Sequence, residues 1–322
     1  MKDDLREQIT RLADQNKFKE IVRLIEQIPE NGRDRETVGS YIRALNNTGQ
    51  LERAVEVSLQ YQERDADDPL WHYRLGYAYV NLGRLEEAEA VLLRGKELAK
   101  DDAQVTEWID ELLEQVAEEK ENAVDKEEAE ARRRAVFVPR DPDKPFFDGV
   151  LFDNFWDDCD YALKEYVGAP AADWMFAEAE KTLGFRLPES YKQLMRRHNG
   201  GMPKFDRFIL PFASRKEPDE IHITAIMGVD PAKQMSLCGE LGSRYMIGEW
   251  GYPDIGVAVC DCPSAGHDMI FLDYRRCGPE GEPEVIHIDQ ECDYAITYLA
   301  GDFESFILGL RQDGEGDKIE RD

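Results

Sequence analysis

The sequence lacks several features that would place the chain in a specialised class. It has no run of about 18 apolar residues, which a helix needs to cross a bilayer, and its opening MKDDLREQIT has no signal-peptide core. Only 6 of its 322 residues are cysteine, without the spacing of a disulfide framework, which favours free thiols in a reducing compartment. We therefore expect a cytoplasmic protein of two domains.

Basic residues are scarce relative to acidic ones. The chain has 40 Lys and Arg against 68 Asp and Glu, a net charge of −28. Residues 1–100 are nearly balanced (16 basic, 19 acidic), whereas residues 101–150 carry 7 against 16 and residues 251–322 carry 5 against 17. Such a field repels phosphate backbones and anionic lipids, so we expect no direct nucleic-acid or membrane contact and an attraction for a basic partner. The alternative is that acidity only keeps the chain dissolved.

The first hundred residues contain a repeat with a period of 34 residues. Matching positions hold Gly49 and Gly83, Leu51 and Leu85, Glu52 and Glu86, and Ala54 and Ala88. A degenerate earlier unit places Asn16, Phe18 and Ile21 at the equivalent positions. Each unit predicts two helices joined by a short turn at Gly or Asn. The unit with Leu75, Gly76, Tyr79 and Ala88 resembles the tetratricopeptide repeat (TPR) pattern.

The small residues of this unit have a packing role. We expect Gly76 and Ala88 where the two helices cross closely, with larger residues filling the groove between them. One such hairpin cannot bury its own apolar face, so about three hairpins and a terminal cap are needed. The residues placed to supply that cap are Trp108, Ile109 and Leu112. The prediction is an all-α, TPR-like array over residues 1–115.

Residues 116–145 are predicted to be a charged helical extension followed by a linker. Between residues 117 and 134 the only large apolar residue is Val124, which favours a solvated helix that continues the cap. The run Arg132–Arg134 suits a helix C-terminus, where the dipole favours positive charge. Three prolines in PRDPDKP, residues 139–145, then end the helix.

From Phe146 onward the pattern changes to mixed helix and strand. Helical periodicity covers Ala171–Leu183 and a segment that opens at Pro188, and Asp302 is placed to cap a final helix. Strand-like runs are Phe208–Phe212, Ile221–Ile226, Val257–Cys262, Met269–Tyr274 and Glu284–Asp289. The order of elements predicts an α+β domain with an antiparallel sheet over residues 146–312, followed by an acidic tail at 313–322.

Two separated motifs make residues 146–312 resemble the SUKH superfamily. The first is LGFRLPESY at 183–191, followed by Asn199-Gly200-Gly201, and the second is PSAGHDM at 263–269, followed by LDY at 272–274 and CGPEGEP at 277–283. The resemblance implies an α+β protein-binding scaffold. Bacterial members are toxin-immunity proteins, and fungal relatives are regulators linked to cell-wall synthesis. Because the superfamily shares no catalytic constellation, the resemblance brings no catalytic residues.

The motif residues themselves have structural roles that follow from their chemistry. We expect Leu183 and Leu187 in the core, Pro188 at the start of a helix, Tyr191 packed on that helix, and the segment 199–201 turning the chain.

Two groups of residues have side chains that could carry chemistry. His267, Asp268, His287 and Asp289, with Asp273, have metal-ligating side chains, but no regular ligand spacing, so a hydrogen-bonded turn is the preferred interpretation. Cys260 and Cys262 lie one residue apart on a strand, which suits buried apolar thiols better than zinc ligands. We therefore expect no metal, no cofactor and no enzymatic activity.

The candidate partner-binding residues combine aromatic rings and carboxylates. Trp250 and Tyr252 lie in a loop broken by Gly and Pro, where a ring either covers the core or anchors a partner. The other candidates are His267, Asp268, Asp273, Glu280, Glu282, Glu284 and Asp289. Together with Glu291 and Asp293, the carboxylates of this set form an acidic cluster that would imitate nucleic-acid phosphates in a nuclease groove.

The sequence thus predicts an immunity protein that binds a toxin with a basic surface. The alternative is an adaptor in which the repeats and the second domain bind different proteins. A metal-dependent enzyme is the third and weakest hypothesis.

Overall fold

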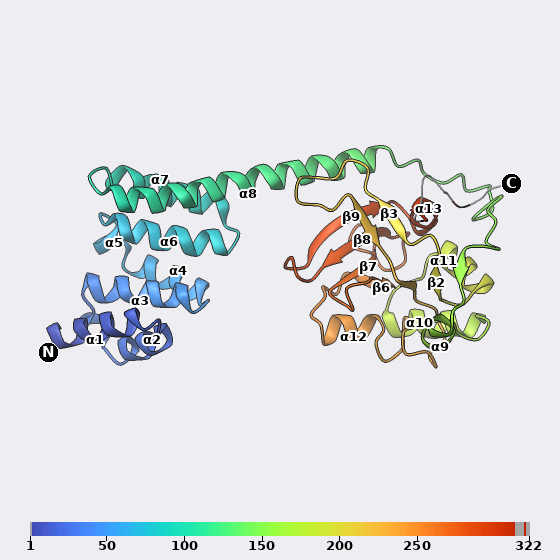
Figure 1. Ribbon diagram of the computed structural model, residues 1–322, viewed down its shortest axis with the longest axis horizontal. Coiled ribbons are helices and arrows are strands. Elements are labelled where there is room, and N and C mark those ends of the chain that lie inside the picture. The colour runs from blue at the N-terminus through green and yellow to red at the C-terminus, as the bar shows by residue number, and fades with distance from the viewer. Residues whose placement is uncertain (1, 313–318, 320–322) are drawn as a thin grey trace. The chain divides into compact units, whose positions relative to one another are not determined.

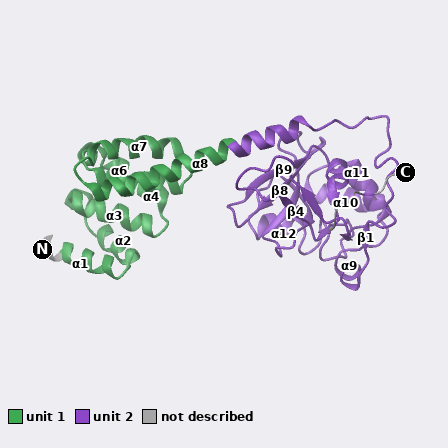
Figure 2. Ribbon diagram, turned by 45° about the horizontal axis from the view of Figure 1, so that its top comes forward, with its two compact units in different colours: residues 1–124 green, residues 125–322 purple. Residues whose placement is uncertain are grey.

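The computed structural model describes residues 2–312 and residue 319. It contains two compact units, residues 1–124 and residues 125–322 (Figures 1 and 2). The division falls within one long helix, α8 (Ala103–Ala135). The first unit is helical and the second contains antiparallel sheets, as predicted.

Six helices of the first unit form three hairpins. The hairpins pair α1 with α2, α3 with α4, and α6 with α7, and their bounds are Lys2–Asp14, Phe18–Glu26, Arg35–Asn47, Leu51–Gln60, Pro69–Asn81 and Leu85–Leu98. The short helix α5 (Gln62–Asp65) precedes α6. The predicted turn residues Asn16, Gly49 and Gly83 all have left-handed backbone, with φ of 54°, 72° and 68°. Each hairpin therefore turns at the same repeat position, and the 34-residue register is confirmed.

Close packing within the third hairpin explains its small residues. A Cβ atom on Gly76 would lie 2.4 Å from Cδ2 of Leu92, so α6 and α7 approach each other at this glycine. Ala88 and Leu75 are buried as predicted. Gly76 packs against Leu92, which lies one helical turn beyond Ala88. The repeat pattern did not identify Leu92 as this contact.

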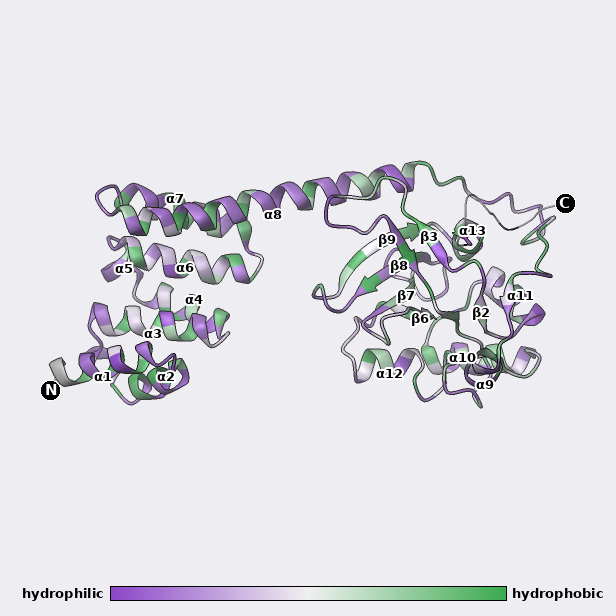
Figure 3. Ribbon diagram, viewed as in Figure 1, coloured by the Kyte–Doolittle hydropathy of each residue, from purple (hydrophilic) through white to green (hydrophobic). Residues whose placement is uncertain are grey.

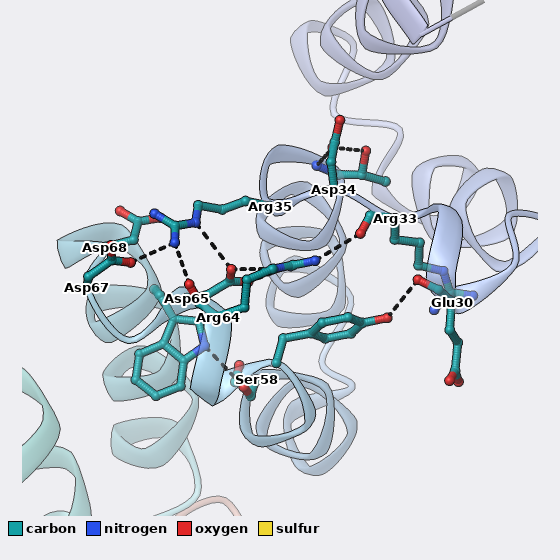
Figure 4. Close-up of polar contacts among 12 residues, drawn as sticks. Glu30, Arg33, Asp34, Arg35, Ser58, Arg64, Asp65, Asp67 and Asp68 are labelled. Atoms are coloured by element: carbon teal, nitrogen blue, oxygen red, sulfur yellow. Dashed lines mark hydrogen bonds and ion pairs between the residues drawn. The ribbon is translucent and has the colours of Figure 1, made fainter.

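A buried carboxylate links successive hairpins (Figure 4). Asp65 on α5 accepts hydrogen bonds from Arg64 at 2.6 and 2.7 Å and from Nε of Arg35 at 3.2 Å. Arg64 also donates to the carbonyl oxygen of Arg33 at 3.0 Å. Because Asp65 is 2% exposed and satisfied by two guanidinium groups, it fixes the start of α3 against α5.

Helix α8 begins as the predicted cap, since Ile109 and Leu112 are buried and Trp108 is partly exposed. Its later turns are mostly polar (Figure 3). The expectation that these turns are solvated throughout is wrong at Arg133, whose side chain is 1% exposed and whose Nη2 lies 2.8 Å from Oε1 of Glu217. Arg134, which like Arg133 belongs to the second unit, contacts the ring of Tyr298 and the carboxylate of Glu284.

A five-stranded antiparallel sheet with the order β5-β6-β7-β8-β9 forms the centre of the second unit. Its strands are Ala225–Ile226, Gly256–Asp261, Asp268–Asp273, Glu284–Asp289 and Ala295–Ala300. A three-stranded sheet, β10-β3-β4, consists of Leu310–Arg311, Arg207–Ile209 and Glu220–His222. Strands β1 (Trp156–Asp157) and β2 (Met202–Pro203) form a separate pair.

The helices of this unit are α9 to α13, with bounds Asp160–Glu165, Asp173–Leu183, Glu189–Arg197, Ser243–Gly248 and Phe303–Gly309. As predicted, Pro188 precedes α11 and Asp302 caps α13, accepting from the backbone N–H of Ser305 at 2.7 Å. Two expectations need correction. The run Ile221–Ile226 is split between β4 and β5 in different sheets, and β9 was not predicted. The predicted acidic tail, apart from Ile319, lies outside the described residues.

The motif residues have the structural roles expected of them. Leu183 and Leu187 are buried, and the Tyr191 hydroxyl donates to the carbonyl oxygen of Met227 at 2.6 Å. Asn199 accepts from the backbone N–H of Val229 at 2.8 Å and donates to the carbonyl oxygen of Ala169 at 2.6 Å. The motif therefore joins α11 to the loops that surround the central sheet.

Candidate functional site

The antiparallel pairing of β7 with β8 divides the predicted carboxylates between two ends of one hairpin. Asp268 lies opposite Asp289, and Asp273 lies opposite Glu284. Five residue steps separate the two pairs along β7, a distance of roughly 17 Å at strand spacing. The predicted residues therefore form two groups rather than one cluster.

At the loop end of this hairpin the carboxylates are matched by arginines. Asp273 is buried and lies 2.6 Å from Nη2 of Arg275. Glu284 lies 3.0 Å from Arg276 and 3.5 Å from Arg134. Glu280 is exposed at the rim of a hollow that also contains Lys181, Arg186 and Lys192, and Glu282 is exposed on the same loop. Local basic groups thus offset much of the negative charge here.

The opposite end, which we call the sheet-end surface, consists of Trp250, His267, Asp268, Asp289 and Glu291. Its charged contacts involve histidines: Asp268 Oδ2 lies 2.7 Å from Nε2 of His287, and Glu291 lies 3.8 Å from Nδ1 of His267. Among the residues that the structure describes, none of these three carboxylates forms an ion pair with Lys or Arg. This surface therefore keeps most of its negative charge.

Asp268 is held in its ionised form. Burial acts to raise its pKa, but hydrogen bonds involving His287 and Ser264 outweigh burial and leave the pKa below its ordinary value. The Ser264 hydroxyl accepts from the backbone N–H of Asp268 at 2.8 Å, and Nδ1 of His267 lies 2.9 Å from the side-chain oxygen of Gln290. Asp268 thus carries a charge at the start of β7.

The two candidate rings lie at different depths. Tyr252 is 2% exposed and donates its hydroxyl to the carbonyl oxygen of Gly266 at 2.8 Å, so it covers the core and has no free surface. Trp250 is partly buried, and its ring meets His267 edge-on with centroids 5.2 Å apart. Tyr294 donates to the carbonyl oxygen of Trp250 at 2.5 Å, which ties the Trp250 loop to the turn after β8.

Two tight turns border the sheet-end surface. Ala265 and Gly266 between β6 and β7 have φ of 58° and 99°, and Asp293 and Tyr294 between β8 and β9 have φ of 54° and 56°. Left-handed backbone at three non-glycine residues is costly, and such costs concentrate at functional positions. Glu291 and Asp293 belong to the predicted acidic cluster, and both are exposed in the turn between β8 and β9.

Within the described residues, the thiols and carboxylates are not grouped as a metal site. Cys260 and Cys262 are buried, as predicted, and burial raises both thiol pKa values well above the ordinary value, which makes the thiols unreactive. Across residues 2–312, no three His, Cys, Asp or Glu side chains are grouped as a metal ion would require.

The first unit has a hollow of its own, about 420 Å³ in volume, which we call the array groove. It is lined by Arg43, Asn46, Asn47, Leu70, Tyr73, Arg74, Tyr77 and Trp108. The repeat pattern predicted helices with a groove between them but gave no lining residues.

Comparison with known proteins matches one family in the helical unit and another in the unit that contains the sheets. Residues 170–309 match the SMI1 / KNR4 family (SUKH-1), and residues 72–102 match a tetratricopeptide repeat. Both kinds of domain are generally protein-binding modules without catalytic activity. A search of curated proteins finds no match.

Three solved structures resemble part of this chain, each over 37% of its length. Two are structures of the Yersinia enterocolitica type III secretion translocator chaperone SycD. The first has 16% sequence identity and a TM-score of 0.35, and the match covers 85% of that chain. The second, an alternative dimer, has 17% identity and a TM-score of 0.34, and the match covers 93% of that chain. The third is a type III secretion complex from Aeromonas hydrophila, with 18% sequence identity, a TM-score of 0.33 and a match over 82% of that chain. These low scores carry no functional argument. In the described part of the chain, no helix is both long and apolar enough to span a membrane.

Proposed function

With residues 170–309 forming a SUKH-1 domain behind tetratricopeptide repeats, we propose that this protein is a cytoplasmic immunity protein. It neutralises a toxin by stoichiometric binding rather than by catalysis. The observation that carries the proposal is the sheet-end surface. There, three carboxylates that have no Lys or Arg partner among the described residues lie near His267, whose ring meets that of the partly buried Trp250. Charge and an aromatic ring together are typical of protein interfaces.

The chemistry of this surface favours a basic partner. Asp268, Asp289 and Glu291 present negative charge from two adjacent turns, and the exposed Asp293 adds to it. Toxins that cleave or modify nucleic acid expose basic grooves that bind phosphates. Carboxylates at this surface take the place of those phosphates, and Trp250 supplies apolar contact area beside them.

The test begins with the full chain as bait in native lysate, compared with the double variant Asp289→Asn/Glu291→Gln. Glu291 is exposed, and Asp289→Asn keeps a side-chain oxygen that can accept from the backbone N–H of Cys292, as Asp289 does at 3.2 Å, so we expect the variant to fold. The control Glu240→Gln/Glu280→Gln removes two carboxylates at exposed positions outside the sheet-end surface. A partner captured by the wild type and the control, but weakly by the first variant, is then expressed alone. The proposal requires that this partner be toxic alone and harmless when the full chain is present.

The alternative function is that of an adaptor, and a specific observation favours it. The array groove is lined by two arginines and no acidic residue, in contrast to the sheet-end surface. Surfaces of unlike charge in the two units suit different partners. Capture of several non-toxic proteins, divided between variants of the groove and of the sheet end, would support the adaptor and contradict the immunity function.

A further inference from the structure

A hollow of about 410 Å³ in the second unit, which we call the aspartate hollow, adjoins the turn between β6 and β7. It is lined by Asp157, Met202, Pro203, Lys204, Asp206, Ile223, Thr224, Pro263 and Gln312. Pro263 and His267 belong to the same turn, four positions apart, and His267 is part of the sheet-end surface. One turn therefore takes part in both features.

The hollow contains two carboxylates that no cation neutralises. Asp157 is exposed on β1, and Asp206 is partly exposed between β2 and β3. In the part of the chain that the structure describes, neither carboxylate has a hydrogen bond or an ion pair. Lys204, the cation among the lining residues, instead donates from Nζ to the side-chain oxygen of Asn154 at 2.6 Å. Both carboxylates are thus free to accept from a ligand.

Backbone hydrogen bonds fix the walls of the hollow. The N–H of Ile223 donates to the carbonyl oxygen of Asp206 at 2.8 Å, and the N–H of Thr224 donates to the carbonyl oxygen of Asp261 at 2.7 Å. The pairing of β1 with β2 holds a further wall. A site that is already formed spends little binding free energy on ordering itself.

Much of the remaining lining is apolar. Ile223 is 2% exposed, Pro203 is buried, and Met202 and Pro263 are more accessible. A cation on a long apolar stem matches this combination of carboxylates and apolar side chains. Between the two such side chains, arginine fits better, because its guanidinium is weakly hydrated and has five N–H groups with which to reach two carboxylates at once.

We propose that the aspartate hollow receives one arginine side chain of the basic partner that binds the sheet-end surface, an inference that rests on the proposed function. The guanidinium donates hydrogen bonds to Asp157 and Asp206, and the aliphatic stem packs on Met202 and Ile223. The hollow thereby adds a specific anchor to an interface that otherwise depends on charge.

The probe for this proposal is N-acetyl-arginine amide, titrated into the full chain with isotope-labelled methionine methyl groups. We expect a saturable shift of the Met202 methyl signal in the NMR spectrum. The uncharged analogue N-acetyl-citrulline amide has nearly the same shape and should leave the signal in place at the same concentration. This comparison uses the wild type alone, so it does not depend on the folding of any variant.

A pair of matched variants locates the binding. Asp157→Asn/Asp206→Asn should weaken binding of the arginine probe roughly tenfold or more, because two charge-assisted hydrogen bonds are lost. The control Asp219→Asn/Asp254→Asn removes two exposed carboxylates outside the hollow and should change binding less than about twofold. A partner captured by the full chain should also bind the first variant more weakly than the control.

Several results would overturn the proposal. These are an unchanged Met202 signal, equal shifts with the arginine and citrulline probes, or equal affinity of the arginine probe for the two double variants. Binding of N-acetyl-lysine amide as tight as that of the arginine probe would show a site for any cation and contradict the assignment to arginine. No toxin is present in the titration, so loss of neutralisation in the sheet-end variant and loss of arginine binding in the hollow variant are separate outcomes.

Discussion

The hydroxyl of Tyr274 donates to the carbonyl oxygen of Arg186, with the two oxygen atoms 2.5 Å apart. These residues are 88 positions apart in the chain and belong to the two separate motifs of the second unit. The Tyr274 ring also stacks on Phe185 at 4.6 Å, and the backbone N–H of Arg186 donates to the carbonyl oxygen of Pro279 at 2.8 Å. The two motifs therefore meet in one contact within the second unit.

Removing this hydroxyl should loosen the contact without disturbing the core. We expect Tyr274→Phe to destabilise the second unit by about 1 kcal/mol, because the half-buried hydrogen bond to Arg186 is lost while the ring stacking remains. Hydrogen exchange of the amides in β7 and in residues 183–187 measures the effect. Unchanged exchange in both segments would show that the hydrogen bond contributes nothing.

Gly200 is needed for close approach as well as for its backbone angle. Its φ is 81°, and a Cβ atom there would lie 2.6 Å from the backbone nitrogen of Gly228 and 2.8 Å from the carbonyl oxygen of Tyr166. We expect Gly200→Ala to cost about 3 kcal/mol or more. The control Gly278→Ala has a φ of 74° and free space around the added methyl, so it should cost only about 1 kcal/mol. Equal thermal shifts for the two variants would contradict this account.

The N-cap of α3 predicts a pH dependence. Hydrogen bonds from the Thr37 hydroxyl and backbone N–H lower the pKa of Asp34 from 3.8 to about 2. A lowered carboxyl pKa stabilises the fold above about pH 4, and this stabilisation is lost as the pH falls towards 2. Asp34 is partly exposed, so we expect Asp34→Ala to cost only about 1 kcal/mol at pH 7 and less at pH 3.

Asn caps helices as well as Asp does, which makes Asp34→Asn the matched control. It should keep most of the stability at pH 7 and show no loss specific to this position at pH 3. Urea unfolding followed by helical circular dichroism at both pH values provides the comparison. A difference between wild type and Asp34→Ala that does not change with pH would refute the prediction.

The buried pair of Arg133 and Glu217 should behave as a unit. Burial acts to raise the pKa of Glu217, but hydrogen bonds from Arg133 and Ser214 outweigh it and lower the pKa. Removing either partner leaves a buried charge, so we expect Arg133→Met or Glu217→Leu alone to cost about 3–5 kcal/mol. The double variant should cost clearly less than the two single variants together. Additive losses in calorimetric unfolding would show that the two side chains do not act as a pair.

Local patterns predicted the repeats and most of the strands. The turns at Asn16, Gly49 and Gly83 and the cap at Asp302 depend on neighbouring residues only, and the sequence shows these directly. Strand β9 was missed because its sequence, AITYLA, follows a turn made by Asp293 and Tyr294 instead of glycine. The burial of Arg133 depends on Glu217, 84 positions away, which no local pattern reveals.

The binding residues were predicted only in part, for a similar reason. Charge density identifies acidic residues along the chain, but strand register decides which of them share a surface. Asp268 and Asp289 are brought together by the pairing of β7 with β8, whereas Asp273 is buried against Arg275. Periodicity also does not show that Tyr252 is buried while Trp250 is partly exposed.

The most direct measurement for the proposed function is a titration of the captured partner's activity with the purified full chain. The account predicts complete inhibition at a 1:1 molar ratio, and a much weaker effect of the double variant Asp289→Asn/Glu291→Gln at the same ratio. A partner that binds the full chain and keeps its activity at molar excess would contradict the immunity function.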